Sequence, residues 1–174
     1  MNQHQPDADA KNLTQDAAIE KIRQIAKSAR VCLLGTSEGH LPLEVRPMTV
    51  QDVDAVGNFW FLGARSSFQT RQIGRHPQAQ LMVSNPDASE FLSLQGRAFV
   101  TDSRPLKEKY WNALALSWFP GGVDDPELVV IRFQPESGHY WDTAFGRAVT
   151  LLQVAVSALT GHPLAIGVEG DVRP

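Results

Sequence analysis

The chain has few of the residues that would indicate secretion, a metal site or a membrane span. Its 174 residues include one cysteine, Cys32, so no disulfide can form within the chain and we expect a reducing, cytoplasmic location. The longest apolar stretch, 148–159, contains polar residues and is too short to cross a bilayer. The five histidines are scattered without metal-ligand spacing. These features predict a cytoplasmic protein without a membrane anchor or a metal.

An excess of one charge is also lacking. Lys and Arg number 16 against 19 Asp and Glu, a formal net charge of −3, which argues against a nucleic-acid-binding protein that works by bulk charge. The sequence contains no G-x-G-x-x-G, Walker, G-x-S-x-G or H-E-x-x-H motif. With 43% hydrophobic residues, the length fits one globular domain.

The pattern along the chain predicts three parts. Residues 1–11 are polar and lack periodicity, which is typical of a disordered leader, residues 12–160 form one domain, and 161–174 read as a polar tail. Apolar residues at helical spacing predict helices over about 14–29, 103–118 and 144–159. Short β-branched or alternating runs predict strands at 31–36, 41–50, 58–63, 78–84, 90–102, 127–135 and 138–143.

These elements predict an α+β fold with a mainly antiparallel β-barrel. Consecutive strands are joined by turns too short for a parallel crossover, and about six to seven short strands favour a barrel over a doubly wound sheet. Helices flank the strands at the start, in the middle and at the end of the domain. Gly96 lies inside the predicted strand 90–102 and indicates a bulge or a close backbone approach.

One region is unusual in its charge. Residues 55–86 contain no acidic residue but include Arg65, Arg71 and Arg75. Within it, Ser66 and Gln69 fit the S-x-x-Q capping box of a short helix, whose free N–H groups and dipole favour an anion. Arg46 adds a cation on a neighbouring strand. Two interpretations stay open: a phosphate clamp without a glycine-rich loop, or a capped surface helix with solvated arginines.

The aromatic residues offer a platform for a flat ligand. Residues 59–61 (FWF) lie on one predicted strand, and Trp141 lies next to Asp142 on another. An aromatic ring ligand needs an apolar platform and a few placed polar groups, which these residues supply. Trp111 and Trp118 fall at helical spacing and favour core or dimer packing instead.

Taken in order, these motifs resemble the pyridoxamine 5′-phosphate oxidase-like FMN-binding split barrels, in the branch of general stress protein 26. The resemblance covers about 15–145. It is carried by residues 43–48 (LEVRPM), 59–62 (FWFL), 66–69 (SSFQ), 91–98 (FLSLQGRA), 118–122 (WFPGG) with 125–126 (DP), and 139–142 (HYWD).

The resemblance implies a homodimer with FMN sites, or possible FAD sites, at the subunit interface. The strand arginine, Arg46, would hold the phosphate, and Trp141 would reach the flavin from the partner subunit. Gln69 departs from the family pattern, which has a lysine there; Arg65 or Arg71 would have to compensate. The other implied binding residues are Pro47, Met48 and Thr49 beneath the isoalloxazine ring, Phe61, Leu62 and Gly63 as a second wall, and Ser66 and Ser67 at the helix start.

The resemblance further implies a stress-related flavin-dependent oxidoreductase with an unknown substrate. Pyridoxamine phosphate oxidation itself is not expected, because 148–151 (AVTL) replaces the charged segment that holds the vitamin in true oxidases. No side chain stands out as an acid, base or nucleophile, so no catalytic residue is assigned. Two alternatives stay open: a flavin carrier or sensor without turnover, and a dimeric scaffold whose site has decayed.

Overall fold

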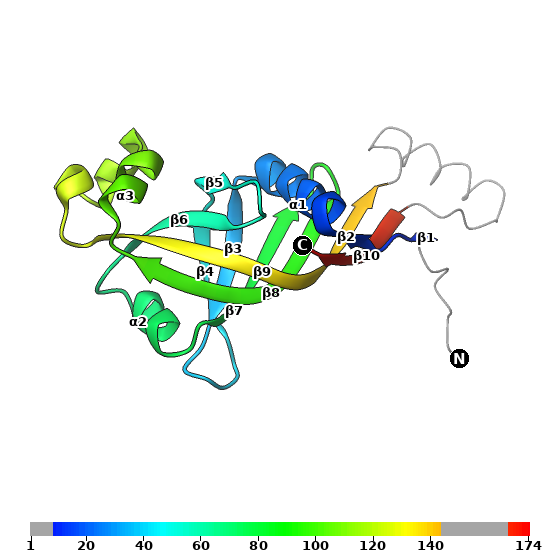
Figure 1. Ribbon diagram of the computed structural model, residues 1–174, viewed down its shortest axis with the longest axis horizontal. Helices are drawn as coiled ribbons and strands as arrows, with labels where there is room; N and C mark the ends of the chain where they lie inside the picture. Colours follow the sequence, from blue (N-terminus) through cyan, green and yellow to red (C-terminus); the bar gives the residue numbers. More distant parts are fainter. Residues whose placement is uncertain (1–8, 144–166) are drawn as a thin grey trace.

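The computed structural model describes residues 9–143 and 167–174 (Figure 1). Its helices are α1 (Gln15–Ala29), α2 (Phe68–Arg75) and α3 (Arg104–Tyr110), with the 3₁₀ turns η1 (Ala113–Ser117) and η2 (Gly122–Asp124). Its strands are β1 (Asp9–Ala10), β2 (Leu13–Thr14), β3 (Val31–Thr36), β4 (Glu44–Thr49), β5 (Asp52–Val53), β6 (Phe59–Ala64), β7 (Gln78–Asn85), β8 (Glu90–Thr101), β9 (Leu128–Thr143) and β10 (Gly167–Arg173). The predicted α+β class is confirmed, with more strands than expected.

The strands form one sheet in the order β1-β10-β9-β8-β7-β3-β4, and β6 pairs with β9. The pairs are antiparallel except for the parallel contacts of β1 and β2 with β10. The long strand β9 organises the sheet. One edge pairs with β8, and the other edge pairs first with β6 and then, further along, with β10.

The core lies between the curved sheet and α1. Ile22 and Ile25 on α1 are fully buried, at helical spacing, as the apolar periodicity predicts. On the sheet side, Phe59 stacks on Phe61 with ring centroids 6.4 Å apart and meets the edge of Phe133 at 6.2 Å. Figure 1 shows α1 against one face of the sheet, with α2 and α3 near the other end of β9.

The bulge expected at Gly96 is present. The β8–β9 register shifts between Gln95 and Gly96, so that Ser137 faces Gln95 while Pro135 faces Gly96. A Cβ added at Gly96 would lie 2.1 Å from the Gln134 carbonyl oxygen, closer than any side chain can approach. Glycine is therefore required because two backbones meet there.

The expected helix over 103–118 is wrong in its second half. The helix α3 ends at Tyr110, and the chain turns at Trp111 into the short η1. The Asn112 side chain causes the break, since its Oδ1 accepts from Leu114 N at 3.1 Å and its Nδ2 donates to Gln51 at 2.7 Å. As a result Leu114, expected on the buried face, is 80% exposed.

Three further segments differ from expectation or fall outside what the structure describes. Residues 127–143, expected as two strands, form the single strand β9, because Pro135 sits at the bulge rather than ending the strand. Residues 167–173, within the expected tail, form β10 and pair with the end of β9. The expected helix 144–159 lies outside the described residues. Across the part that is described, no helix combines the length and the apolar character that a membrane span requires.

Candidate functional site

Arg46, Pro47, Met48 and Thr49 lie on β4, which ends the path of the sheet. Antiparallel register places Arg46 opposite Leu34, on the side of β4 that faces the core, and Pro47 opposite Leu33, on the other side. Arg46 is nevertheless exposed and has no hydrogen bond or ion pair with any described residue. Its guanidinium is therefore free to form a bidentate pair of hydrogen bonds with an anion.

The aromatic strand β6 pairs with β5 and β9 and lies next to β4. The Phe61 ring is fully buried in the core, so a ligand at this strand would meet its backbone rather than its ring. Leu62 points to the other side and packs with Phe119 beneath η1. A Cβ at Gly63 would lie 2.7 Å from Ile131 Cδ1, so a larger residue there would have to displace the Ile131 side chain.

The corner between β6 and α2 differs from the predicted capping box. Ser67, not Ser66, caps the helix, and its Oγ accepts from Thr70 N at 3.1 Å. Ser66 instead donates to Glu127, from its backbone N–H at 3.0 Å and from its hydroxyl at 2.6 Å. Gln69 is only 4% exposed, and its Nε2 has no hydrogen-bond partner among the described residues. The box predicted from Ser66 and Gln69 is therefore wrong.

The arginines of the acid-free segment each have a partner within the chain, and two of them pair with carboxylates from outside the segment. Arg65 donates to Asp102 at 2.5 Å and to the Pro126 carbonyl oxygen at 2.8 Å. Arg71 donates to the Ser66 carbonyl oxygen at 2.5 Å. The third, Arg75, pairs with Glu38 at 3.3 Å. Among the four arginines considered for a phosphate clamp, Arg46 is the one without a hydrogen bond or ion pair to the described part of the chain.

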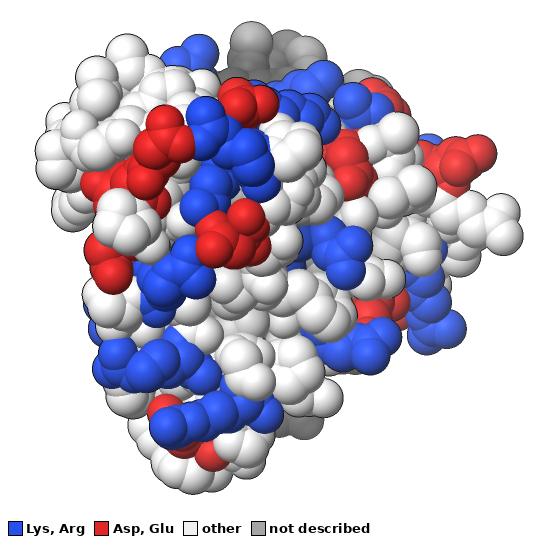
Figure 2. Space-filling view, turned by 60° about the vertical axis from the view of Figure 1, so that its left-hand side comes forward, with Lys and Arg blue, Asp and Glu red and all other residues white. Residues whose placement is uncertain are grey.

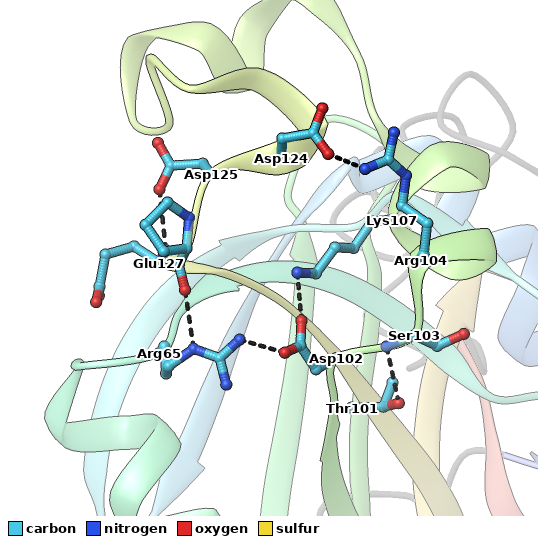
Figure 3. Close-up of polar contacts among 10 residues, drawn as sticks. Arg65, Thr101, Asp102, Ser103, Arg104, Lys107, Asp124, Asp125 and Glu127 are labelled. Atoms are coloured by element: carbon cyan, nitrogen blue, oxygen red, sulfur yellow. Dashed lines mark hydrogen bonds and ion pairs between the residues drawn. The ribbon is translucent and has the colours of Figure 1, made fainter.

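Asp102 joins the ends of β6 and β8 to α3 (Figure 3). Its carboxylate pairs with Arg65 on one side and with the largely buried Lys107 on the other. Hydrogen bonds from Lys107 and Arg65 hold the pKa of Asp102 below its ordinary value. On the far side of α3, Arg104 pairs with Asp124 of η2, so the charged groups fix the α3–η2 segment to the barrel.

Trp141 lies far from this corner, on the outward side of β9. Its ring is 4.6 Å from that of His139, whose Nδ1 lies 3.0 Å from the Asp171 carboxylate. Both rings border a shallow concavity of about 340 Å³. The concavity is lined by Ser93, Gln95, Ser137, Gly138, His139, Trp141, Asp171 and Arg173.

One face of the sheet, opposite the core, exposes several apolar side chains among polar ones. Register links Pro47, Leu33, Met82, Ser93 and His139 in one row across five strands, and residues facing each other across antiparallel strands share a face. We call this the outer sheet face and define it by its exposed apolar residues, Val31, Leu33, Val45, Phe91 and Trp141. These five side chains make the outer sheet face a candidate interaction surface.

A single chain does not bring all the expected residues together. Gly63 faces Val129 near the start of β9, whereas Trp141 lies twelve residues further along the same strand. At about 3.3 Å per residue, the two positions are roughly 40 Å apart along the strand. That separation exceeds the length of a flavin mononucleotide. The residues at β6 and the α2 corner thus lie toward the opposite end of β9 from Trp141, whereas Pro47 on β4 shares a row of the sheet with His139, two residues before Trp141.

Two features of the site were missed in the sequence. Glu127 follows an Asp-Pro turn and gives no sign that its partner is Ser66, sixty-one positions earlier. Asp171 lies in the segment interpreted as a tail, so its pairing with His139 could not be predicted. In both cases the partner lies far away in the sequence, so no local pattern indicates the contact.

The charged surface at the α3 end of the molecule carries both signs. Figure 2 shows basic and acidic groups interleaved there.

The chain matches known proteins over most of its length. The family model described as "Pyridoxamine 5′-phosphate oxidase like" matches residues 17–164. The curated general stress protein 26 of Bacillus subtilis is 25% identical over 76 residues, 42% of this chain and 54% of that protein. Protein bli-3 of Neurospora crassa is 27% identical over 90 residues, covering 47% and 43% of the two chains. The chain thus spans about half the length of these curated relatives.

Solved structures agree with this assignment. A structure described as a general stress protein 26 from Jannaschia sp. CCS1 has a TM-score of 0.75 and 26% identity, covering 92% of this chain and all of that one. A general stress FMN/FAD binding protein from Xanthomonas citri has a TM-score of 0.63 and 24% identity, covering 74% and 90%. The chain belongs to the pyridoxamine 5′-phosphate oxidase-like family, with a fold shared with the general stress protein 26 structures.

Proposed function

We propose that this chain is a cytoplasmic, stress-related homodimer that binds FMN between its subunits. In this proposal Arg46 holds the phosphate, and the backbone of Pro47, Met48 and Thr49 lies along the ring system. Trp141 of the second subunit covers the flavin. Membership of the family and a flavin-binding protein of the same fold support this proposal.

The residues present fit a flavin phosphate in part. Arg46 offers an exposed, unpaired guanidinium on a strand held by its neighbour β3. Gln69 supplies a buried amide donor without a partner among the described residues. A buried donor left unpaired costs free energy, which a ligand oxygen would recover. Against this fit, the donors of Ser66 are already taken by Glu127.

The observation that carries the proposal is the separation of Gly63 and Trp141 along β9. Because Gly63 and Trp141 lie roughly 40 Å apart along the strand, a flavin that contacts both of these residues needs a second copy of the chain. The outer sheet face provides an apolar surface on which that copy can pack. In a two-fold symmetric dimer the same face of each subunit forms the interface, so the dimer has two equivalent sites.

A bound flavin would supply hydride or electron transfer, while the protein supplies binding and electrostatics. In the proposed site Arg46 neutralises the phosphate. The Trp141 ring excludes water from one face of the ligand, and Asp171 holds the neighbouring His139 in place. The oxidoreductase role and its substrate belong to the proposal, and no residue is assigned a proton-transfer step.

Flavin titration tests the proposal directly. The purified protein should bind FMN with a perturbed visible spectrum, and Arg46→Ala should weaken FMN binding about 10- to 100-fold, the loss expected for a charge-assisted bond to phosphate. Lys27→Ala, which removes an exposed cation from α1, should leave the affinity unchanged. Unchanged binding in Arg46→Ala would contradict the assignment.

The same sample separates the alternatives. Bleaching of bound flavin by NADH or NADPH indicates an oxidoreductase. A coloured protein that no reductant bleaches indicates a carrier or sensor. A protein that binds no added flavin indicates a scaffold, the alternative that the internally satisfied Ser66 donors favour.

A further inference from the structure

The corner between β6 and α2 already holds an anion supplied by the protein. The Glu127 carboxylate accepts from the Ser66 hydroxyl at 2.6 Å and from the Ser66 backbone N–H at 3.0 Å. These are donors that the corner would otherwise offer to a phosphate. Hydrogen bonds from Ser66 hold the pKa of Glu127 below its ordinary value, so the carboxylate is charged at neutral pH.

Neighbouring cations offset this charge only in part. Arg65 lies close enough to favour the charged carboxylate, but its guanidinium is shared with Asp102 (Figure 3). Arg71 donates to the Ser66 carbonyl oxygen, and its guanidinium lies 5.6 Å from the Phe68 ring centroid. Asp125 lies two residues before Glu127 and adds a second negative charge beside it. The corner is therefore less attractive to a dianion than its arginines suggest.

Gln69 offers a phosphate a hydrogen bond but no charge. It is the second residue of α2, it is largely buried, and its side chain is neutral. Its Nε2 is a donor without a partner among the described residues. The corner thus keeps one free neutral donor at Gln69, while the donors of Ser66 are occupied.

We propose that Glu127 determines which flavin the site accepts, because its carboxylate competes with a terminal phosphate for the donors of Ser66. This inference rests on the proposed flavin-binding function. A phosphate monoester carries nearly two negative charges at neutral pH. FMN has such a group, each phosphate of FAD carries a single charge, and riboflavin has none. FMN must displace Glu127 from Ser66, so Glu127 lowers the affinity for FMN most and that for riboflavin not at all.

Quenching of flavin fluorescence measures the three affinities in the full-length protein. Glu127→Gln should tighten FMN binding about three- to tenfold, because a neutral amide oxygen holds the Ser66 donors more weakly than the charged carboxylate does. The gain for FAD should be smaller, and riboflavin should show none. Glu136→Gln is the matched control, since it removes an exposed carboxylate that accepts from Arg97 at 2.6 Å and leaves Ser66 untouched. It should change none of the three affinities.

A second substitution locates the effect at Ser66. In a Ser66→Ala background, Glu127→Gln should yield a smaller gain for FMN, because the hydroxyl that the phosphate would use is gone. Glu127→Ala provides a second variant with the same expected direction, and thermal unfolding of each variant checks that it is folded. An unchanged FMN affinity, or an equal gain for riboflavin, would overturn the role of Glu127 while leaving flavin binding intact. Failure of the wild type and of Glu127→Gln to bind any of the three flavins would instead overturn the proposed function, and this inference with it.

Discussion

At the scale of single residues, Asp54 holds the turn between β5 and β6. Its carboxylate accepts from the backbone N–H groups of Val56 and Asn58, at 3.1 and 2.9 Å, and from the side chains of Asn58 and Trp60, both at 3.0 Å. Burial alone would raise the pKa of Asp54, but these hydrogen bonds together outweigh it and place the pKa below its ordinary value of 3.8. The turn is thus held by the ionised carboxylate.

The lowered pKa of Asp54 predicts a pH-dependent stability. The ionised form is favoured in the folded state, so the stabilisation is present above the ordinary value of 3.8 and is lost as pH falls through the lower folded-state value. Asp54→Asn should lower Tm by roughly 2–4 °C at neutral pH. Thermal unfolding followed by circular dichroism from pH 7 to pH 2 should show the two proteins converging at the acid end. A difference that stays constant over this range would contradict the assignment.

A substitution at Gln69 tests whether a positive charge at the start of α2 strengthens FMN binding. The resemblance suggests a lysine at this position, but Gln69 is only 4% exposed, so Gln69→Lys would bury an ammonium group at the positive end of α2. The variant without flavin should therefore unfold at a lower temperature than the wild type. Added FMN should raise its Tm more than it raises that of the wild type, whereas riboflavin should not. An equal rise with both flavins would show that the phosphate does not reach this corner.

At the scale of elements, the β8–β9 bulge requires a glycine at position 96. Because a Cβ at Gly96 would lie 2.1 Å from the Gln134 carbonyl oxygen, Gly96→Ala should destabilise the protein by about 2 kcal/mol or more. At Gly74 in α2, a Cβ would have nothing within 4 Å, so Gly74→Ala should stabilise by about 0.5–1 kcal/mol. Urea unfolding of both variants measures the contrast. Equal effects would mean that the close approach at Gly96 is not required.

The elements also show what a sequence can predict. Local patterns suffice for α1 and for β3, β6, β7 and β8, since each has its own periodicity and its own turn signals. They fail where a distant residue competes. Asn112 ends the helix with the help of a hydrogen bond to Gln51, which is distant in the sequence. Ser66 does not cap α2, because its hydroxyl donates to Glu127 instead. The candidate site follows the same rule: the sequence shows Arg46 as a cation on a strand, but the pairing of Arg65 with Asp102 depends on the fold.

At the scale of the whole molecule, the outer sheet face should hold two copies together. Stable dimers bury about 2,000 Å² or more, and this face carries the exposed apolar side chains of Val31, Leu33, Val45, Phe91 and Trp141. Leu33→Asp places a carboxylate in its middle and should weaken dimerisation about 100-fold or more, the cost of an unpaired buried charge. Val56→Asp, at an exposed apolar residue on the β5–β6 turn, should not. Light scattering over a concentration series measures both, and a dimer unaffected by Leu33→Asp would place the interface elsewhere.

The central claim is that each flavin site combines Arg46 of one subunit with Trp141 of the other, and mixing two defective variants tests it most directly. Arg46→Ala and Trp141→Ala should each bind FMN weakly alone. After unfolding together at equal amounts and refolding, half of the dimers carry one copy of each, and each of these regains one intact site. Tight FMN binding should therefore return in about a quarter of all sites. If both residues act within one chain, no mixture recovers binding, and that result would contradict the shared site.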